Sequence, residues 1–367
     1  MVAALLCAAS SAIAAEQSGR PADSDRAAIA LEALSRLKNV DLETNPAIKA
    51  AVFKVLEQVR GTPQFVEIVR DFKITGQDEA LLDFAVDSAG TSAGAEAIHL
   101  VLEHEKFDLL RTSLAGTNAV KVTEALGGAG GKEIVPLLEP IVTDKSRELG
   151  LRKQVVHALA KVPEGAAALV RLASEQKLPD DLKLTASSEL NSVRWPDLKA
   201  QAAQLLPLPQ ALNSQSLPPI SELIKRKGDS AKGAEVFRRE TVACIKCHQV
   251  RGEGIDFGPD LSEIGTKLGK DAIYESILDP SVGISFGYEA WQLELKNGDE
   301  PYGFIASETA DELAIKAVGG IVTRYKKSDI VRRQKQKLSI MPAGLQQTMT
   351  VQELVDLVEY LAGLKKE

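Results

Sequence analysis

The pentapeptide Cys244-Ile245-Lys246-Cys247-His248 carries the clearest chemical signal in the sequence. Two thiols stand one helical turn apart and an imidazole follows directly. This spacing suits two thioether bonds to the vinyl groups of haem and one nitrogen ligand to its iron. The 367-residue chain has only 3 cysteines and 4 histidines, so a chance match is rare. The pattern predicts one covalently attached haem c, with Cys244 and Cys247 as attachment points and His248 as an iron ligand.

Two other chemistries also use closely spaced cysteines. Structural zinc needs four ligands, but only Cys7 remains, and the other histidines (His99, His104 and His157) precede residue 207 and are expected to be ordinary surface or core residues. A thioredoxin-like pair is typical of a strand-to-helix turn, whereas here a helical pattern (residues 230–239) precedes the motif and a glycine-rich loop follows it. Both alternatives therefore rank below haem attachment.

The flanks of the motif resemble the class I cytochrome c domain. Residues 228–237 (GDSAKGAEVF) are similar to its N-terminal helix, and residues 252–254 (GEG) and 258–261 (GPDL) are similar to the loop below the haem. The resemblance implies that the carbonyl of Pro259 accepts a hydrogen bond from Nδ1 of His248, which leaves Nε2 for iron.

The same resemblance implies a methionine as the second axial ligand. After residue 220 the methionines are Met341 and Met349. Met341 precedes Pro342, which disfavours helix, so we expect it in an extended loop from which the thioether reaches the iron. Met349 directly precedes Thr350, the expected N-cap of a helix over residues 351–364, and is expected to staple onto Leu354. Met341 is the favoured ligand, and Met349 or a position without methionine stays open.

An interval far longer than a small cytochrome c needs separates residues 279–281 from Met341. Apolar Trp291, Leu293 and Leu295 alternate with polar residues and lead into a hairpin signal, Asn297-Gly298. The pattern predicts a small antiparallel β insertion at about residues 286–338, with further strands over residues 302–307, 312–318 and 321–325. A haem domain with such an insertion resembles the haem-binding family described for planctomycetes and verrucomicrobia, which is often attached to HEAT-like repeats or to sugar-dehydrogenase-type propellers.

Basic residues crowd the end of this insertion, with only Asp329 opposing them. A solvated loop or a charged sheet edge explains such a run. A sharper hypothesis is a patch beside the haem that steers an acidic redox partner. The residues are Arg324, Lys326, Lys327, Arg332, Arg333, Lys335 and Lys337.

The rest of the chain predicts a mainly α protein. Residues 22–207 are rich in Ala and Leu, with apolar positions at helical spacing and similar segments at offsets of about 30 to 40 residues, which is typical of stacked helical hairpins. This resembles an α-solenoid of HEAT-like repeats, with an irregular helical bundle as the alternative. Residues 208–220 read as a Pro-rich linker, and residues 221–367 as an all-α cytochrome c domain with the β insertion.

Composition and the N-terminal segment bear on partners and location. The net charge of -7 and the interspersed charges give no basic face, so nucleic acid is a poor candidate partner. Residues 1–15 form an apolar run with an A-x-A-like end, typical of a secretory signal peptide, although no basic residue precedes it. No later run has the length of a membrane span. We therefore expect export to the periplasm.

These features together predict a c-type cytochrome that transfers one electron at a time and is not itself an enzyme. Its expected partner is a periplasmic dehydrogenase. Two alternatives remain open. The haem could bind a small ligand, as in a sensor or a peroxidase-like enzyme, or the repeats could act as a scaffold with a structural haem.

Overall fold

A computed structural model describes residues 42–207, 217–239, 242 and 244–366. The predicted signal peptide and residues 208–216 of the predicted linker lie outside this part of the chain. The chain forms two compact units, with the boundary between Ile74 and Thr75. Within the described residues, no helix is both long and apolar enough to cross a membrane.

The first unit contains helices α2 (Pro46–Gln58) and α3 (Pro63–Asp71), which pack on each other. Each begins with proline, whose fixed φ suits the first helical position. In α3 the buried Phe65, Val66 and Val69 recur at helical spacing, so one face of the helix is apolar.

The second unit begins with a run of short helices separated by tight turns. Alternate helices contact one another in two rows, α5–α7–α9–α11 and α6–α8–α10–α12, and α4 packs on α5. This is the arrangement expected of stacked helical hairpins, while the likeness to HEAT repeats stays a prediction. The bounds are α4 (Asp78–Asp87), α5 (Ser92–Glu103), α6 (Phe107–Ala115), α7 (Ala119–Ala129), η1 (Lys132–Ile134), α8 (Val135–Thr143), α9 (Leu149–Leu159), α10 (Pro163–Ser174), η2 (Asp180–Leu182), α11 (Lys183–Leu190) and α12 (Pro196–Leu205).

Two of these hairpins share the same close turn. Gly94 is the third residue of α5, and a Cβ there would collide with the carbonyl of Ser88. Gly165 is the third residue of α10, and a Cβ there would collide with the carbonyl of Leu159. The spacing from carbonyl to glycine is the same in both turns, so the same backbone contact occurs twice in this run of helices.

Helices return at the last residue of the predicted linker. They are α13 (Ile220–Leu223), α14 (Ser230–Arg238), η3 (Cys244–Lys246), α15 (Ile264–Lys267), α16 (Lys270–Leu278), η5 (Leu345–Thr348) and α17 (Val351–Gly363). Helices α14 and α17 cross closely because Gly233 has no side chain to separate them: a Cβ there would meet the carbonyl of Asp356. The buried core around the crossing includes Phe237, Tyr274 and Val358.

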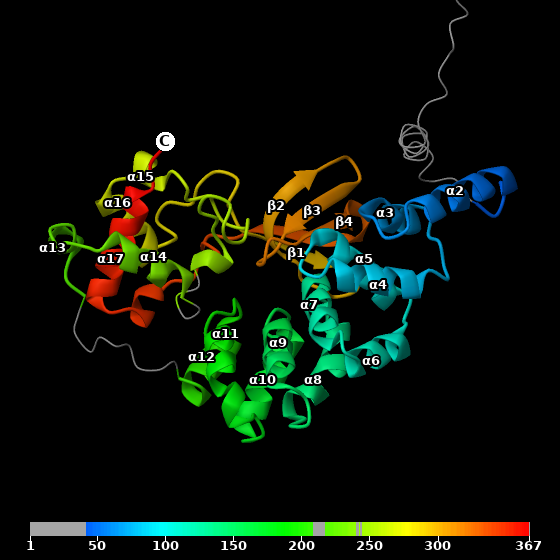
Figure 1. Cartoon of the computed structure of the whole chain (residues 1–367), viewed down its shortest axis with the longest axis horizontal. Coiled ribbons are helices and arrows are strands. Elements are labelled where there is room, and N and C mark those ends of the chain that lie inside the picture. Colours follow the sequence, from blue (N-terminus) through cyan, green and yellow to red (C-terminus); the bar gives the residue numbers. More distant parts are fainter. Residues whose placement is uncertain (1–41, 208–216, 240–241, 243, 367) are drawn as a thin grey trace, which may run out of the picture. The chain divides into compact units, whose positions relative to one another are not determined.

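The predicted insertion is a five-stranded antiparallel sheet with the strand order β4-β3-β2-β1-β5 (Figure 1, orange). Its buried centre is Leu293, Leu313 and Ile315. The expected strands are present at nearly the expected positions. The strands are β1 (Trp291–Leu295), β2 (Tyr302–Glu308), β3 (Glu312–Lys316), β4 (Val322–Lys326) and β5 (Ile330–Lys335), with η4 (Lys327–Asp329) before the last.

The first and last strands of the insertion pair with each other. Trp291 lies opposite Lys335, and just outside the ladder the N–H of Gln336 donates to the carbonyl of Ala290 at 2.8 Å. The N–H of Ser339 then donates to Oγ of Ser281 at 3.1 Å. The chain therefore enters and leaves the sheet at one place, which lets a sheet interrupt the helical part without separating α16 from the Met341 segment.

Strand β5 was not predicted, because its basic residues mask any alternation. It forms one edge of the sheet, so the charged-edge interpretation of the basic run holds for β5.

The C-terminal helix begins where expected: Thr350 Oγ accepts the N–H of Glu353, and the Glu353 carboxylate accepts the N–H of Thr350, as a capping box does.

Candidate functional site

The CxxCH motif forms a single tight turn at η3. The N–H groups of Cys247 and His248 both donate to the carbonyl of Cys244, at 3.1 and 2.9 Å. Cys244 and Ile245 pack against the same apolar core that α14 and α17 form. Two thiols and one imidazole are thus presented from one turn at the edge of a core.

The ring of His248 is held by the backbone. Its Nδ1 lies 2.7 Å from the carbonyl oxygen of Pro259, so Nδ1 carries the proton and donates, and Nε2 keeps its lone pair. Burial lowers the pKa of His248, although the hydrogen bond to Pro259 acts in the opposite direction. The lowered pKa favours the neutral imidazole, which is the form that binds a metal.

The segment after Phe257 passes close to this ring. The N–H groups of Phe257 and Gly258 donate to the carbonyl of Cys247, at 3.2 and 2.6 Å. A Cβ on Gly258 would lie 2.7 Å from Cε1 of His248 and 2.9 Å from Nδ1. Glycine is required there because any side chain would push the ring or the loop away.

The two cysteines remain free thiols. Burial raises the pKa of Cys244 to about 12 and that of Cys247 to about 11, so neither is a thiolate near neutral pH. A thioredoxin-like role needs a lowered thiol pKa and fits poorly. Among the residues that the structure describes, no three His, Cys, Asp or Glu side chains gather as metal ligands.

The two candidate methionines differ in burial. Met349 is 1% exposed within the core cluster, which also contains Leu354, the residue with which it was expected to staple. Met341 is partly buried at the margin of that cluster, as Cys244 is, and its N–H donates to Oγ of Ser339 at 3.2 Å. Met341 thus lies in a loop with its thioether less enclosed, whereas Met349 fills the core.

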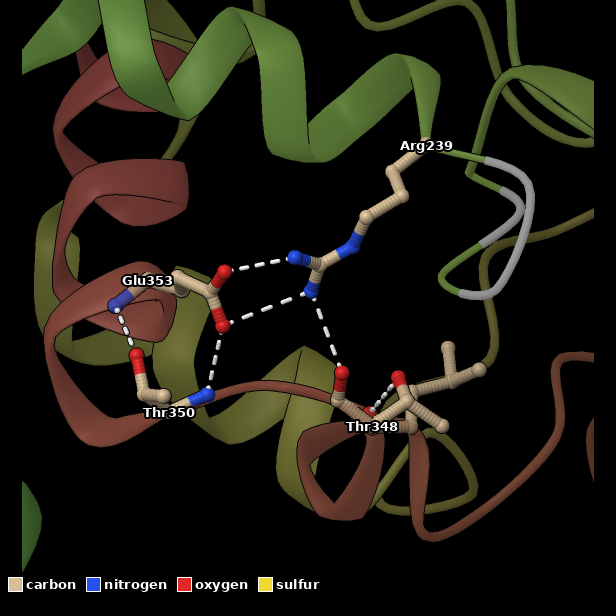
Figure 2. A network of polar contacts seen from close by, with 5 residues as sticks. Arg239, Thr348, Thr350 and Glu353 are labelled. Carbon is tan, nitrogen blue, oxygen red and sulfur yellow. Dashed lines mark hydrogen bonds and ion pairs between the residues drawn. The ribbon is translucent and has the colours of Figure 1, made fainter. Parts of the chain in front are cut away.

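Arg239 connects the chain just before the motif to the start of α17 (Figure 2). Its Nη1 donates to Oε1 of Glu353 at 2.5 Å, and its Nη2 donates to the carbonyl of Thr348 at 3.1 Å. The Glu353 carboxylate also accepts the N–H of Thr350 at 2.7 Å. The chain before the motif is therefore tied to the start of α17 through one ion pair.

Asp356 joins the same two helices at another point. It is 3% exposed. The backbone N–H of Asp229 and the side-chain Nε2 of Gln352 both donate to its Oδ1, each at 2.8 Å. Sequence reasoning missed both Arg239 and Asp356. A charged residue on the apolar face of a predicted helix could have pointed to Asp356, but Arg239 left no local signal.

Most of the basic run at the end of the insertion is paired. The charge is therefore balanced locally to a large extent, and docking of an acidic partner at this place stays a prediction. The pairs are Arg324–Glu96 at 3.7 Å, Lys327–Glu308 at 2.8 Å, Arg332–Glu294 at 3.2 Å, Arg333–Glu308 at 3.0 Å and Lys335–Glu289 at 3.2 Å.

The remaining histidines each face a carboxylate. His99 Nε2 lies 3.3 Å from Oε1 of Glu103, and His104 Nδ1 lies 2.6 Å from Oδ1 of Asp78. His157 Nδ1 lies 2.8 Å from Oε1 of Glu189. These pairs account for the three side chains without a metal.

One turn with two thiols and a backbone-oriented imidazole is the geometry of a covalent haem-attachment site. Residues 230–302 match the family model described as Cytochrome c. The match supports a cytochrome c domain in this part of the chain, and with it a haem-binding, electron-transfer role and covalently bound haem c. The match ends at the first residue of β2, so Met341 and α17 lie beyond it. No curated protein matches the chain.

Proposed function

We propose that this chain is an exported c-type cytochrome that accepts electrons from a periplasmic dehydrogenase and carries them one at a time. One haem c would be attached at Cys244 and Cys247, with His248 and Met341 as axial ligands. The observation that carries the proposal is the hydrogen bond from Nδ1 of His248 to Pro259. A half-buried imidazole whose Nδ1 is engaged by the backbone keeps Nε2 for a metal, and it stands beside two free thiols.

When bound, haem supplies an iron that cycles between Fe(III) and Fe(II) without bonding to a substrate. The residues of the chain do the rest. Pro259 fixes the plane and tautomer of His248, and Gly258 closes over the ring. The thioether of Met341 would be a soft ligand that favours the reduced state.

The test is the visible spectrum of protein matured in a host that assembles c-type haem. Acid-acetone extraction reports whether the haem is covalent, and the weak Met-to-iron charge-transfer band reports the sixth ligand. We expect low-spin covalent haem whose band is lost in Met341→Ala and kept in Met349→Ala. High-spin haem that binds CO when reduced would favour a ligand sensor or a peroxidase-like enzyme. Protein without haem would leave the scaffold role of the repeats.

A further inference from the structure

The β insertion touches the loop that orients His248. The ring of Phe304, in β2, stacks on the ring of Phe257 with the centroids 4.7 Å apart and the planes at 21°. The ring of Tyr288 meets Phe304 edge-on at 5.3 Å. Both phenylalanines are buried, Phe257 at 3% and Phe304 at 7% exposure, so this is a packed aromatic contact.

A charged contact lies beside the aromatic one. Lys316 of β3 is directly opposite Phe304 in the ladder, and its Nζ lies 2.9 Å from Oδ1 of Asp256. Asp256 is mostly exposed, so this ion pair contributes little stability by itself. It does attach the same β2–β3 hairpin to the residue that precedes Phe257.

The backbone leads from Phe257 to the imidazole in two residues. The N–H of Phe257 is bonded to the motif at Cys247. The next residue is Gly258, which lies against the His248 ring, and Pro259 then accepts the Nδ1 hydrogen bond. A displacement of the Phe257 side chain would therefore move the acceptor that orients His248.

We propose that Phe304 is a positioning residue for His248, and that the β insertion serves to hold the Phe257–Pro259 segment against the imidazole. This inference rests on the proposed function. Residues that orient an iron ligand alter the properties of the metal centre without touching it. The sheet suits the task because its ladder and its buried centre fix the place of β2, whereas a simple loop would not.

The test compares Phe304→Leu with Phe304→Tyr and with Leu313→Ala. Leucine removes the aromatic ring that stacks on Phe257, whereas tyrosine keeps an aromatic ring at this position. Leu313 belongs to the buried centre of the same sheet, so its truncation weakens the sheet without removing a ring from Phe257. Two readouts are used. Hydrogen exchange of the Gly258 amide and the Nδ1–H of His248 reports positioning with or without haem, and the midpoint potential reports its effect on iron.

We expect Phe304→Leu to speed exchange of both protons by about tenfold or more. At a fixed ambient potential, the ratio of reduced to oxidised haem should fall about threefold or more, because a looser loop admits water near the ligand. Phe304→Tyr should keep wild-type values, and Leu313→Ala should change both readouts less than Phe304→Leu does.

Unchanged exchange and potential in a folded Phe304→Leu would overturn the inference, and an equal effect of Leu313→Ala would overturn the role assigned to the Phe304 ring. If Phe304→Leu does not accumulate, Tyr288→Leu is used instead, because it removes the ring that packs edge-on against Phe304. Unchanged exchange of the Gly258 and His248 protons in Tyr288→Leu would overturn the inference as well. Wild-type protein without covalent haem would refute the proposed function instead, and the exchange measurement on that haem-free protein still decides whether Phe304 positions His248.

Discussion

The guanidinium of Arg239 lies across the carboxylate of Glu353, with Nη1 2.5 Å from Oε1 and Nη2 3.4 Å from Oε2. Arg239 directly follows α14, and Glu353 is the third residue of α17. The charge that caps the C-terminal helix therefore also fixes the chain that leads into the CxxCH turn. Loss of the Glu353 charge should therefore weaken both the cap of α17 and the attachment of the chain that leads into the CxxCH turn.

The first prediction concerns acid stability. Burial acts to raise the pKa of Glu353, but hydrogen bonds from Arg239 and Thr350 outweigh it, so the pKa lies below its usual value. A carboxyl with a lowered folded pKa stabilises the protein above its unfolded pKa of about 4.3, and that stability is lost as the pH falls through the folded pKa. We expect the free energy of unfolding to fall from about pH 5 downward, and to fall less in Glu353→Gln.

Urea denaturation across this pH range measures the effect. Glu235→Gln is the control, because Glu235 lies exposed on α14. Identical acid dependence in wild type and in both variants would contradict the prediction.

The second prediction concerns the crossing of α14 and α17. Gly233→Ala places a Cβ against the carbonyl of Asp356 and the side chain of Tyr360, and overpacking of this kind costs about 1 to 3 kcal/mol. Gly150→Ala makes the same change in α9, where no atom lies within 4 Å of the added Cβ. It should be neutral or stabilise by up to about 1 kcal/mol. Thermal denaturation should separate the two variants, and equal effects would show that the crossing tolerates a side chain.

The third prediction contrasts neighbouring arginines on β5. Arg333 lies over the ring of Trp291 at 4.4 Å and also pairs with Glu308, so Arg333→Ala should destabilise the sheet by about 1 kcal/mol. Arg332 is 65% exposed and has an ion pair with Glu294 at 3.2 Å, so Arg332→Ala should cost at most about 0.5 kcal/mol. Fluorescence of Trp291 in urea, recorded in a Trp195→Phe background, follows the sheet. A larger loss of stability in Arg332→Ala than in Arg333→Ala would contradict the prediction.

The fourth prediction concerns the glycine beside His248 and depends on the proposed function. Gly258→Ala puts a Cβ 2.7 Å from Cε1 of the ring, so the ring must turn away from its hydrogen bond to Pro259. We expect a lower yield of covalent haem and an altered iron–histidine stretching frequency. Gly283→Ala, with open space around the added Cβ, should match wild type in both respects. Normal haem yield and frequency in Gly258→Ala would mean that the loop yields without affecting the ligand.

Local patterns in the sequence predicted much of this molecule. The motif turn, the cap formed by Thr350 and Glu353, and four of the five strands all depend on residues that are near one another in the chain. The bond from His248 to Pro259 was implied by the resemblance to cytochrome c. Strand β5 was not predicted, because its run of charged residues shows no alternation of apolar and polar positions.

Contacts between distant segments could not be predicted in this way. Arg239 meets Glu353, Asp229 meets Asp356, and Phe304 meets Phe257 only after the chain has folded. Each residue type is ordinary at its own position, and its partner lies on another element, so no spacing or periodicity points to the pair.

The pairing of Trp291 with Lys335 has a consequence for how the protein folds. Joining the ends of a long flexible loop costs conformational entropy, about 0.6 kcal/mol for each doubling of its length. The contacts of the sheet are mostly between neighbouring strands in the chain, so it can form early. Once it has formed, the connection between α16 and Met341 is effectively short, and α17 can reach α14 at the entropic cost of a small loop.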